Sequence, residues 1–123
     1  MTHKTTFHVY GIPTCSTCKK ALKWLDEQGI EYIWINTREI PPTKQQITRW
    51  IATLGSKALQ NTSGGSYRNL PEEKRCWNDE TWSEEFSKDA MLLKRPIFEH
   101  DGLAISTGFR SSQVLEEHFL DRK

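Results

Sequence analysis

YGIPTCSTCKK, residues 10–20, joins a predicted strand to a predicted amphipathic helix and carries two cysteines three positions apart. Side chains of different polarity alternate along residues 6–10, which are rich in strand-forming types. Gly11 and Pro13 end the predicted strand. The cysteines therefore lie where a helix begins. Unpaired N–H groups and the positive end of the helix dipole stabilise a thiolate at Cys15. In such positions the pKa of a cysteine falls from about 8.5 to roughly 3.5–7.5, so the segment predicts a reactive thiol.

Two other interpretations of the Cys-x-x-Cys pattern remain open at this point. It could be half of a zinc site, but zinc sites normally add a second cysteine pair or histidine pair at ligand spacing. The only other cysteine is Cys76, and the four histidines are scattered at His3, His8, His100 and His118. The two thiols could also be small apolar core residues. The strand–turn–helix setting favours a catalytic pair, and we expect no metal site.

Composition narrows the class of protein. A chain of 123 residues predicts one domain with a single real core. A net charge of +1 gives no electrostatic case for a nucleic-acid partner. No apolar run approaches the roughly 20 residues of a membrane span, and the N-terminus lacks the apolar core of a signal peptide. With an odd number of cysteines, these features predict a cytoplasmic protein without a membrane partner, and we expect a monomer.

The first third of the chain predicts a β-α-β unit. Apolar residues recur at helical spacing from residue 16 to residue 28, and Gly29 suits the left-handed position after a helix end. Residues 32–35 form a continuous apolar run, which is typical of a strand buried on both faces. Short links between strand, helix and strand predict two parallel strands with a right-handed crossover.

A helical insert is predicted next, over about residues 43–92. Thr43 is a plausible N-cap for a helix that is apolar on one face, and residues 61–66 are a small, polar loop. Asp79 is expected to cap a further helix. Cys76 lies beside a tryptophan in this insert and is interpreted as a buried structural thiol, with a resolving role as the alternative.

The last third predicts two antiparallel strands and a helix. Pro96 marks the start of an apolar strand, because proline cannot donate to a central ladder. Residues 100–102 are a hairpin turn signal, residues 103–106 form the return strand, and Ser111 is expected to cap the final helix. The order β-α-β, helical insert, β-β-α is that of an α/β thioredoxin-like redox fold with a mixed sheet. We expect it to form one domain over residues 1–123.

The chain resembles the ArsC/Spx group of glutaredoxin-like proteins along nearly its whole length. The motifs that carry the resemblance follow one another in the same order as in that group. They lie at residues 10–12, 19–21, 24–25, 41–43, 59, 61–62, 67–68, 94–97 and 108–110. Each motif is short, and their order makes the set specific. Within the group the chain is most similar to the YffB and YusI-like branches.

The resemblance implies roles for individual residues. Cys15 matches the nucleophilic cysteine of the group, and Cys18 matches the second cysteine of Spx. Arg95 and Pro96 match the family's Arg-Pro pair, in which the proline is cis and the arginine faces the thiolate. Arg110 matches an oxyanion-binding arginine of the arsenate reductases.

Further substrate contacts are expected from the same comparison. Asn61 stands where arsenate reductases have a third oxyanion arginine, and Arg68 in the neighbouring turn is a candidate to replace that charge. Thr14, directly before the nucleophile, is also a candidate contact. Losing one charged donor weakens an oxyanion site by several kcal/mol in order of magnitude, which argues against arsenate reduction.

These features predict a thiol–disulfide oxidoreductase. Cys15 attacks a disulfide, Cys18 resolves the mixed disulfide, and glutathione is the expected co-substrate, with no bound cofactor. The alternative is an Spx-like redox sensor that binds the α subunit of RNA polymerase. A glycine that Spx uses for that contact matches Gly55, which equally suits a helix end. Genuine arsenate reduction is the third hypothesis.

Overall fold

A four-stranded mixed sheet organises the protein, whose computed structural model describes residues 5–120. The strands run in the order β2-β1-β3-β4, with β1 parallel to β2 and β3 antiparallel to both β1 and β4. The predicted thioredoxin-like α/β fold is confirmed. The sheet elements and the helices that flank them along the chain are β1 (Phe7–Gly11), α1 (Ser16–Gln28), β2 (Ile33–Asn36), β3 (Ile97–His100), β4 (Leu103–Thr107) and α5 (Gln113–Phe119).

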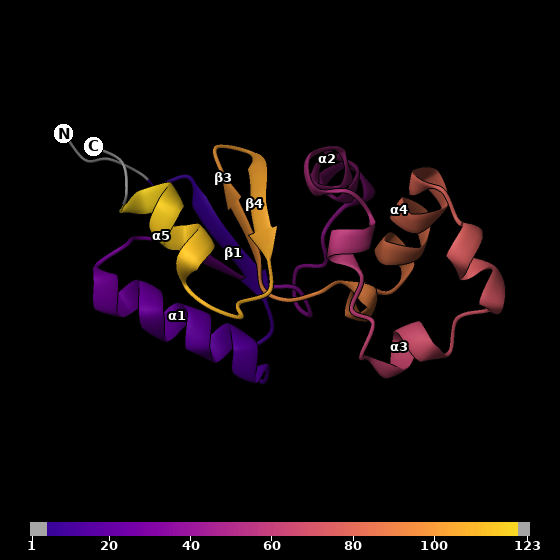
Figure 1. Ribbon diagram of the computed structural model, residues 1–123, viewed down its shortest axis with the longest axis horizontal. Coiled ribbons are helices and arrows are strands. Elements are labelled where there is room, and N and C mark those ends of the chain that lie inside the picture. Colours follow the sequence, from indigo (N-terminus) through magenta and orange to yellow (C-terminus); the bar gives the residue numbers. More distant parts are fainter. Residues whose placement is uncertain (1–4, 121–123) are drawn as a thin grey trace.

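The connection from β2 to β3 consists of helical segments, the loops between them and an isolated bridge between Gln60 and Leu93. The helical segments are α2 (Lys44–Leu54), η1 (Lys57–Leu59), α3 (Gly65–Arg68), η2 (Glu72–Cys76), α4 (Asp79–Lys88) and η3 (Ala90–Leu92). Figure 1 shows the sheet between two layers, with α1 and α5 on one side and α2 on the other. Helix α4 packs on α2, farther from the sheet. No helix within residues 5–120 is long and apolar enough to cross a membrane.

Local signals set most of the element ends. The side chain of Thr43 accepts from the Gln46 N–H, and the Gln46 side chain accepts from the Thr43 N–H, which forms a full capping box. Gly29 ends α1 with φ 69°. Two helix N-caps differ from the prediction by one residue. Asn78, not Asp79, caps α4, and Ser112 rather than Ser111 occupies the N-cap position of α5.

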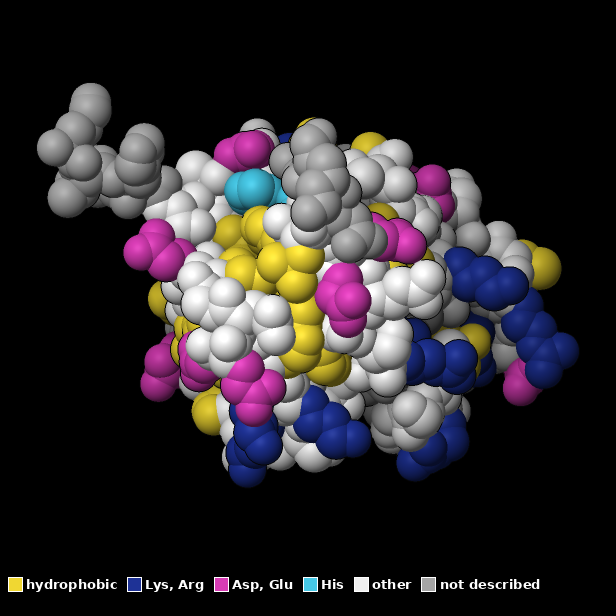
Figure 2. Space-filling model, turned by 60° about the vertical axis from the view of Figure 1, so that its left-hand side comes forward, with side chains coloured by type: hydrophobic (Ala, Val, Ile, Leu, Met, Phe, Trp, Pro, Cys, Tyr) yellow, Lys and Arg dark blue, Asp and Glu magenta, His cyan; other side chains and the backbone are white. Residues whose placement is uncertain are grey.

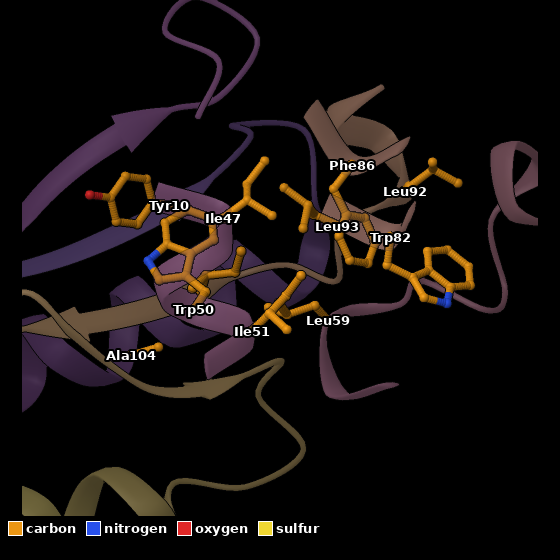
Figure 3. Packing of buried hydrophobic residues seen from close by; sticks show 11 residues of the cluster. Tyr10, Ile47, Trp50, Ile51, Leu59, Trp82, Phe86, Leu92, Leu93 and Ala104 are labelled. Carbon is orange, nitrogen blue, oxygen red and sulfur yellow. The ribbon is translucent and has the colours of Figure 1, made fainter. Parts of the chain in front are cut away.

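Each face of the sheet has its own hydrophobic core. The core beneath α1 and α5 contains Phe7, Val9, Ala21, Leu25, Phe98 and Leu115. The core on the opposite face joins the sheet to α2, α4 and η3, and Figure 3 shows ten of its side chains labelled: Tyr10, Ile47, Trp50, Ile51, Leu59, Trp82, Phe86, Leu92, Leu93 and Ala104. Period-2 alternation on β1 therefore supplies both cores.

A buried carboxylate lies in the second core. Glu99 is 4% exposed and accepts hydrogen bonds from the Tyr10 hydroxyl at 3.0 Å and from Trp50 Nε1 at 2.7 Å. A guanidinium nitrogen of Arg49 lies 3.7 Å from the same carboxylate. Burial, followed by the charge of Glu99, raises the pKa of the Tyr10 hydroxyl. We call Glu99, Tyr10, Trp50 and Arg49 the Glu99 cluster.

Two sequence expectations about burial are wrong. Strand β2 is not buried on both faces, because it lies at the edge of the sheet, and Ile33 is 41% exposed. Cys76 is exposed rather than buried, because it ends the short η2 turn at the surface. The adjacent Trp77 packs against Trp82 instead. An apolar run and a neighbouring tryptophan both indicate burial without saying which side chain faces inward.

Candidate active site

Cys15 occupies the N-cap position of α1, as predicted from the sequence. Its backbone is extended, at φ −81° and ψ 120°, and its carbonyl accepts the first helical hydrogen bond from the Lys19 N–H. The Cys15 N–H donates to the Ile12 carbonyl, which closes the turn after β1. The side chain of Cys15 is half-buried. The first turn of α1 therefore presents its unpaired N–H groups to the sulfur.

The pKa of Cys15 is lowered by its surroundings. Burial acts in the opposite direction, but hydrogen bonds outweigh it. They come from the backbone and thiol of Cys18, from the backbone of Thr17 and from the guanidinium of Arg95. Each of these donors favours the charged form of the sulfur. Cys15 thus has a larger thiolate fraction at neutral pH than an ordinary cysteine, and the thiolate is the nucleophilic form.

Cys18 differs from Cys15 in every respect that matters for reactivity. It is 1% exposed, and burial raises its pKa to about 12. A Cβ atom on Gly11 would lie 2.5 Å from the Cys18 sulfur and 3.0 Å from the Trp34 ring. Only glycine at position 11 leaves room for this packing. At rest, Cys18 is a protonated thiol that donates to Cys15.

Arg95 and Pro96 lie in the short segment between η3 and β3. The peptide bond between them is cis, as the family resemblance implies. Nη1 of Arg95 donates to the Leu93 carbonyl at 3.3 Å, whereas its Nε is buried and has no hydrogen-bond partner in the described part of the chain. The Pro96 carbonyl accepts from the Gly108 N–H at 2.8 Å, which ties β3 to the end of β4.

The start of α1, residues 60–63, residues 94–95 and residues 108–110 line an open cavity of about 450 Å³, which we call the thiol cavity. Its charged lining residues, Lys94, Arg95 and Arg110, are all basic. The other residues of its wall are Cys15, Thr17, Gln60, Asn61, Thr62, Ser63, Gly108 and Phe109. Figure 2 shows Lys and Arg side chains gathered along the lower and right-hand parts of the face that it displays. In Figure 1, α1 begins at the lower end of the molecule.

Not all predicted substrate contacts reach the cavity. Asn61 lines it, although its side-chain amide donates to the Met91 carbonyl at 3.4 Å. The guanidinium of Arg68 instead donates to the Ser63 carbonyl at 2.7 Å, and Arg68 does not line the cavity. Thr14 is exposed and is also absent from the wall. Arg68 is therefore not placed to supply the charge that Asn61 lacks.

Sequence reasoning missed one cation. Lys94 lines the thiol cavity beside Arg95, although its place in a segment before a predicted strand gave no sign of which way it pointed. Its position next to the Arg-Pro pair was the only available signal. Across residues 5–120, no group of three or more Cys, His, Asp or Glu side chains could hold a metal ion.

A cysteine of lowered pKa between β1 and α1, next to a mixed sheet of strand order β2-β1-β3-β4, places the chain among thioredoxin-like proteins. Sequence comparison gives the family: the ArsC family model matches residues 10–117, and the protein belongs to the ArsC family. The chain is 38% identical over 115 residues to the uncharacterized protein YusI of Bacillus subtilis (strain 168), covering 90% of this chain and 95% of YusI.

Proteins named arsenate reductase are more distant relatives. The arsenate reductase of Escherichia coli (strain K12) is 26% identical over 91 residues, which cover 72% of this chain and 64% of that protein. The solved structure of the arsenate reductase from Vibrio cholerae superposes with a TM-score of 0.79 at 26% identity, covering 93% of this chain and 98% of that one. The similarity to proteins named arsenate reductase therefore covers the whole fold as well as the local motifs.

Proposed function

We propose that this protein is a thiol–disulfide oxidoreductase that acts on disulfides in which glutathione takes part. The observation that carries the proposal is a cysteine of lowered pKa at the wall of an open cavity whose charged residues are all basic. A thiolate attacks disulfides, and fixed positive charges attract anionic substrates to it. Glutathione is such a substrate at neutral pH, because its two carboxylates outnumber its one ammonium group.

The chemistry follows from the difference between the two thiols. Cys15 Sγ attacks one sulfur of the substrate disulfide, the S–S bond breaks, and the leaving thiolate takes a proton from water. Cys18 then loses its proton and attacks Cys15 Sγ, which releases the second thiol and forms a Cys15–Cys18 disulfide. Two glutathione molecules reduce this disulfide and leave as oxidised glutathione. The hydrogen bond from the Cys18 thiol to Cys15 at rest supports this step, because it joins the two groups that react.

Arg95 and Arg110 are proposed to hold the anionic groups of the substrate. The unpartnered, buried Nε of Arg95 supports this role, because a buried donor without an acceptor costs free energy that a bound anion would recover. Asn61 is proposed as a neutral contact in the same wall. Pro96 is buried and does not line the thiol cavity, and its carbonyl already accepts from the Gly108 N–H, so we assign it no direct contact with the substrate.

The composition of the cavity favours disulfides over arsenate. Arsenate is a small, highly charged oxyanion that is best held by several forked guanidinium groups. Here two arginines and Lys94 line the cavity, Asn61 is neutral, and Arg68 bonds elsewhere.

Gly55, which matches the polymerase-contacting glycine of Spx, has φ 85°, so backbone conformation alone explains the glycine. The enzymatic role, in the cytoplasm, is therefore the one that we propose.

The proposal is tested by following glutathione-dependent reduction of an S-glutathionylated peptide by the purified protein, coupled to glutathione reductase. Turnover that disappears in Cys15→Ser supports it. Arsenate-dependent turnover with glutathione and glutaredoxin, in the absence of disulfide reduction, would instead make the protein an arsenate reductase. Retention of the polymerase α subunit by a protein inactive in both assays would make it a regulator.

A further inference from the structure

A second, smaller cavity of about 220 Å³ lies directly beside the thiol cavity. The two share one wall, formed by Lys94 and the consecutive residues Gly108, Phe109 and Arg110. We call the smaller one the side cavity. A group bound in one cavity therefore lies only the thickness of this wall from a group bound in the other.

The side cavity is apolar where the thiol cavity is polar. Phe98 and Leu115 are fully buried and line its interior, Phe109 is half-buried, and Val114 on the first turn of α5 is 47% exposed at its opening. Its charged residues, Lys94 and Arg110, belong to the shared wall. Sites for whole small molecules usually span about 300–1,000 Å³, so this cavity suits one side chain rather than a complete ligand.

Lys94 and Gly108 define the boundary between the cavities. Gly108 has φ 76°, and a Cβ atom there would lie 2.9 Å from Cε and 3.6 Å from Nζ of Lys94. The lysine stem thus lies against bare backbone at the shared wall, where a side chain at position 108 would push it away. The ammonium group of Lys94 therefore lies near the wall that the two cavities share.

We propose that the side cavity is a specificity subsite for a bulky apolar side chain next to the disulfide-bonded cysteine of a peptide substrate. This inference rests on the proposed function. The substrate would be a protein cysteine in mixed disulfide with glutathione. The glutathione half occupies the thiol cavity with its carboxylates toward Arg95 and Arg110, and the apolar side chain of the peptide half occupies the side cavity.

In this arrangement Cys15 Sγ attacks the glutathione sulfur. The bond between Cys15 and that sulfur forms, the bond to the peptide sulfur breaks, and the peptide leaves as a thiolate that water protonates. The peptide half is then the leaving group, so its contacts with Phe109 and Val114 contribute to the rate of the first step. Free glutathione disulfide lacks a bulky apolar group and leaves the side cavity unused.

The test uses two S-glutathionylated pentapeptides that differ only in the residue after the cysteine, leucine or alanine. With the full-length protein we expect kcat/KM for the leucine peptide to exceed that for the alanine peptide by about tenfold, the effect of a few methylene groups in an apolar pocket. Val114→Gln should remove most of this preference. Leu120→Gln, which changes an apolar residue of similar exposure outside the cavity, should preserve it.

Equal kcat/KM for the two peptides, or equal loss of preference in the two variants, would overturn the subsite while leaving the proposed function intact. Failure of both peptides to react would overturn the proposed function. In that event the subsite is tested separately with the same two peptides in which serine replaces the cysteine. Their binding to the Cys15→Ser protein is followed by the NMR shifts of the Val114 methyl groups. Shifts with both peptides alike, or with neither, would contradict the subsite.

Discussion

Glu99 in the sheet and Cys15 at the start of α1 are two acidic side chains with opposite surroundings. Glu99 on β3 is enclosed by partners: the Tyr10 hydroxyl, Trp50 Nε1 and the nearby guanidinium of Arg49. Cys15 at the start of α1 faces an open cavity, beside an arginine whose Nε has no partner in the described residues. Hydrogen-bond donors contact both groups, but only Cys15 faces an open cavity.

This difference separates stability from reactivity. A buried carboxylate whose acceptor sites are filled fixes the elements that donate to it, and here it joins β1, β3 and α2. A thiolate with donors on one side and space on the other is held in its charged form and is still free to attack. The Glu99 cluster is expected to govern folding, and the thiol cavity is expected to govern chemistry.

The largest expected effect is on catalysis, from Cys15→Ser. A serine hydroxyl is not ionised at neutral pH, so disulfide reduction should fall by about 1,000-fold or more. The free energy of unfolding should change little, because the side chain is half-buried at a helix start. Activity assays and urea unfolding of the same preparation measure the two quantities. Retained turnover would remove Cys15 from the mechanism.

The largest expected effect on stability comes from Glu99→Gln. The amide keeps the size of the carboxylate but turns one acceptor into a donor, which must face Tyr10 or Trp50. The free energy of unfolding should drop by about 2–3 kcal/mol, while kcat/KM per folded molecule stays constant. Glu84→Gln, which removes an exposed carboxylate paired with Lys44, is the matched control and should have a far smaller effect. Equal losses of stability would show that the Glu99 cluster is not special.

A smaller loss of activity is expected from Arg95→Gln. Removing the guanidinium takes away a donor to Cys15 and a candidate anion contact, so kcat/KM should fall by about 10- to 100-fold. The pH dependence of Cys15 alkylation should move to higher pH. Arg75→Gln, whose guanidinium pairs with Glu72 at the surface and does not line the cavity, serves as the control and should leave both quantities unchanged. The same loss in both variants would point to general surface charge instead.

The smallest expected effect distinguishes two roles of Cys18. Cys18→Ala removes both its hydrogen bond to Cys15 and the resolving thiol, whereas Cys18→Ser removes only the thiol and keeps a donor. The pKa of Cys15 should therefore rise in the alanine variant and rise less in the serine variant. The pKa of Cys15 is measured from alkylation rates at a series of pH values. Equal pKa values in these two variants would show that a hydrogen bond from position 18 does not stabilise the Cys15 thiolate.

Sequence patterns predicted the parts of the molecule that depend on neighbours in the chain. The strand–turn–helix around Cys15, the cap at Thr43 and the turn at Asp101–Gly102 all follow from short motifs. The Glu99 cluster did not, because 89 positions separate Tyr10 from Glu99, and a lone glutamate in a strand gives no sign of burial. The directions of Lys94 and Arg68 were equally hidden, since both depend on how the helical insert folds back on the sheet.

The ionisation of Cys15 can be measured directly by its alkylation rate as a function of pH in a Cys76→Ser variant. Cys76 is exposed and would react as well, whereas Cys18 is buried. Because donors lower the pKa of Cys15, the rate should stay high as pH falls through the ordinary thiol range, near 8.5, and should decline only at lower pH. An inflection at or above the ordinary value would contradict a thiolate at the start of α1.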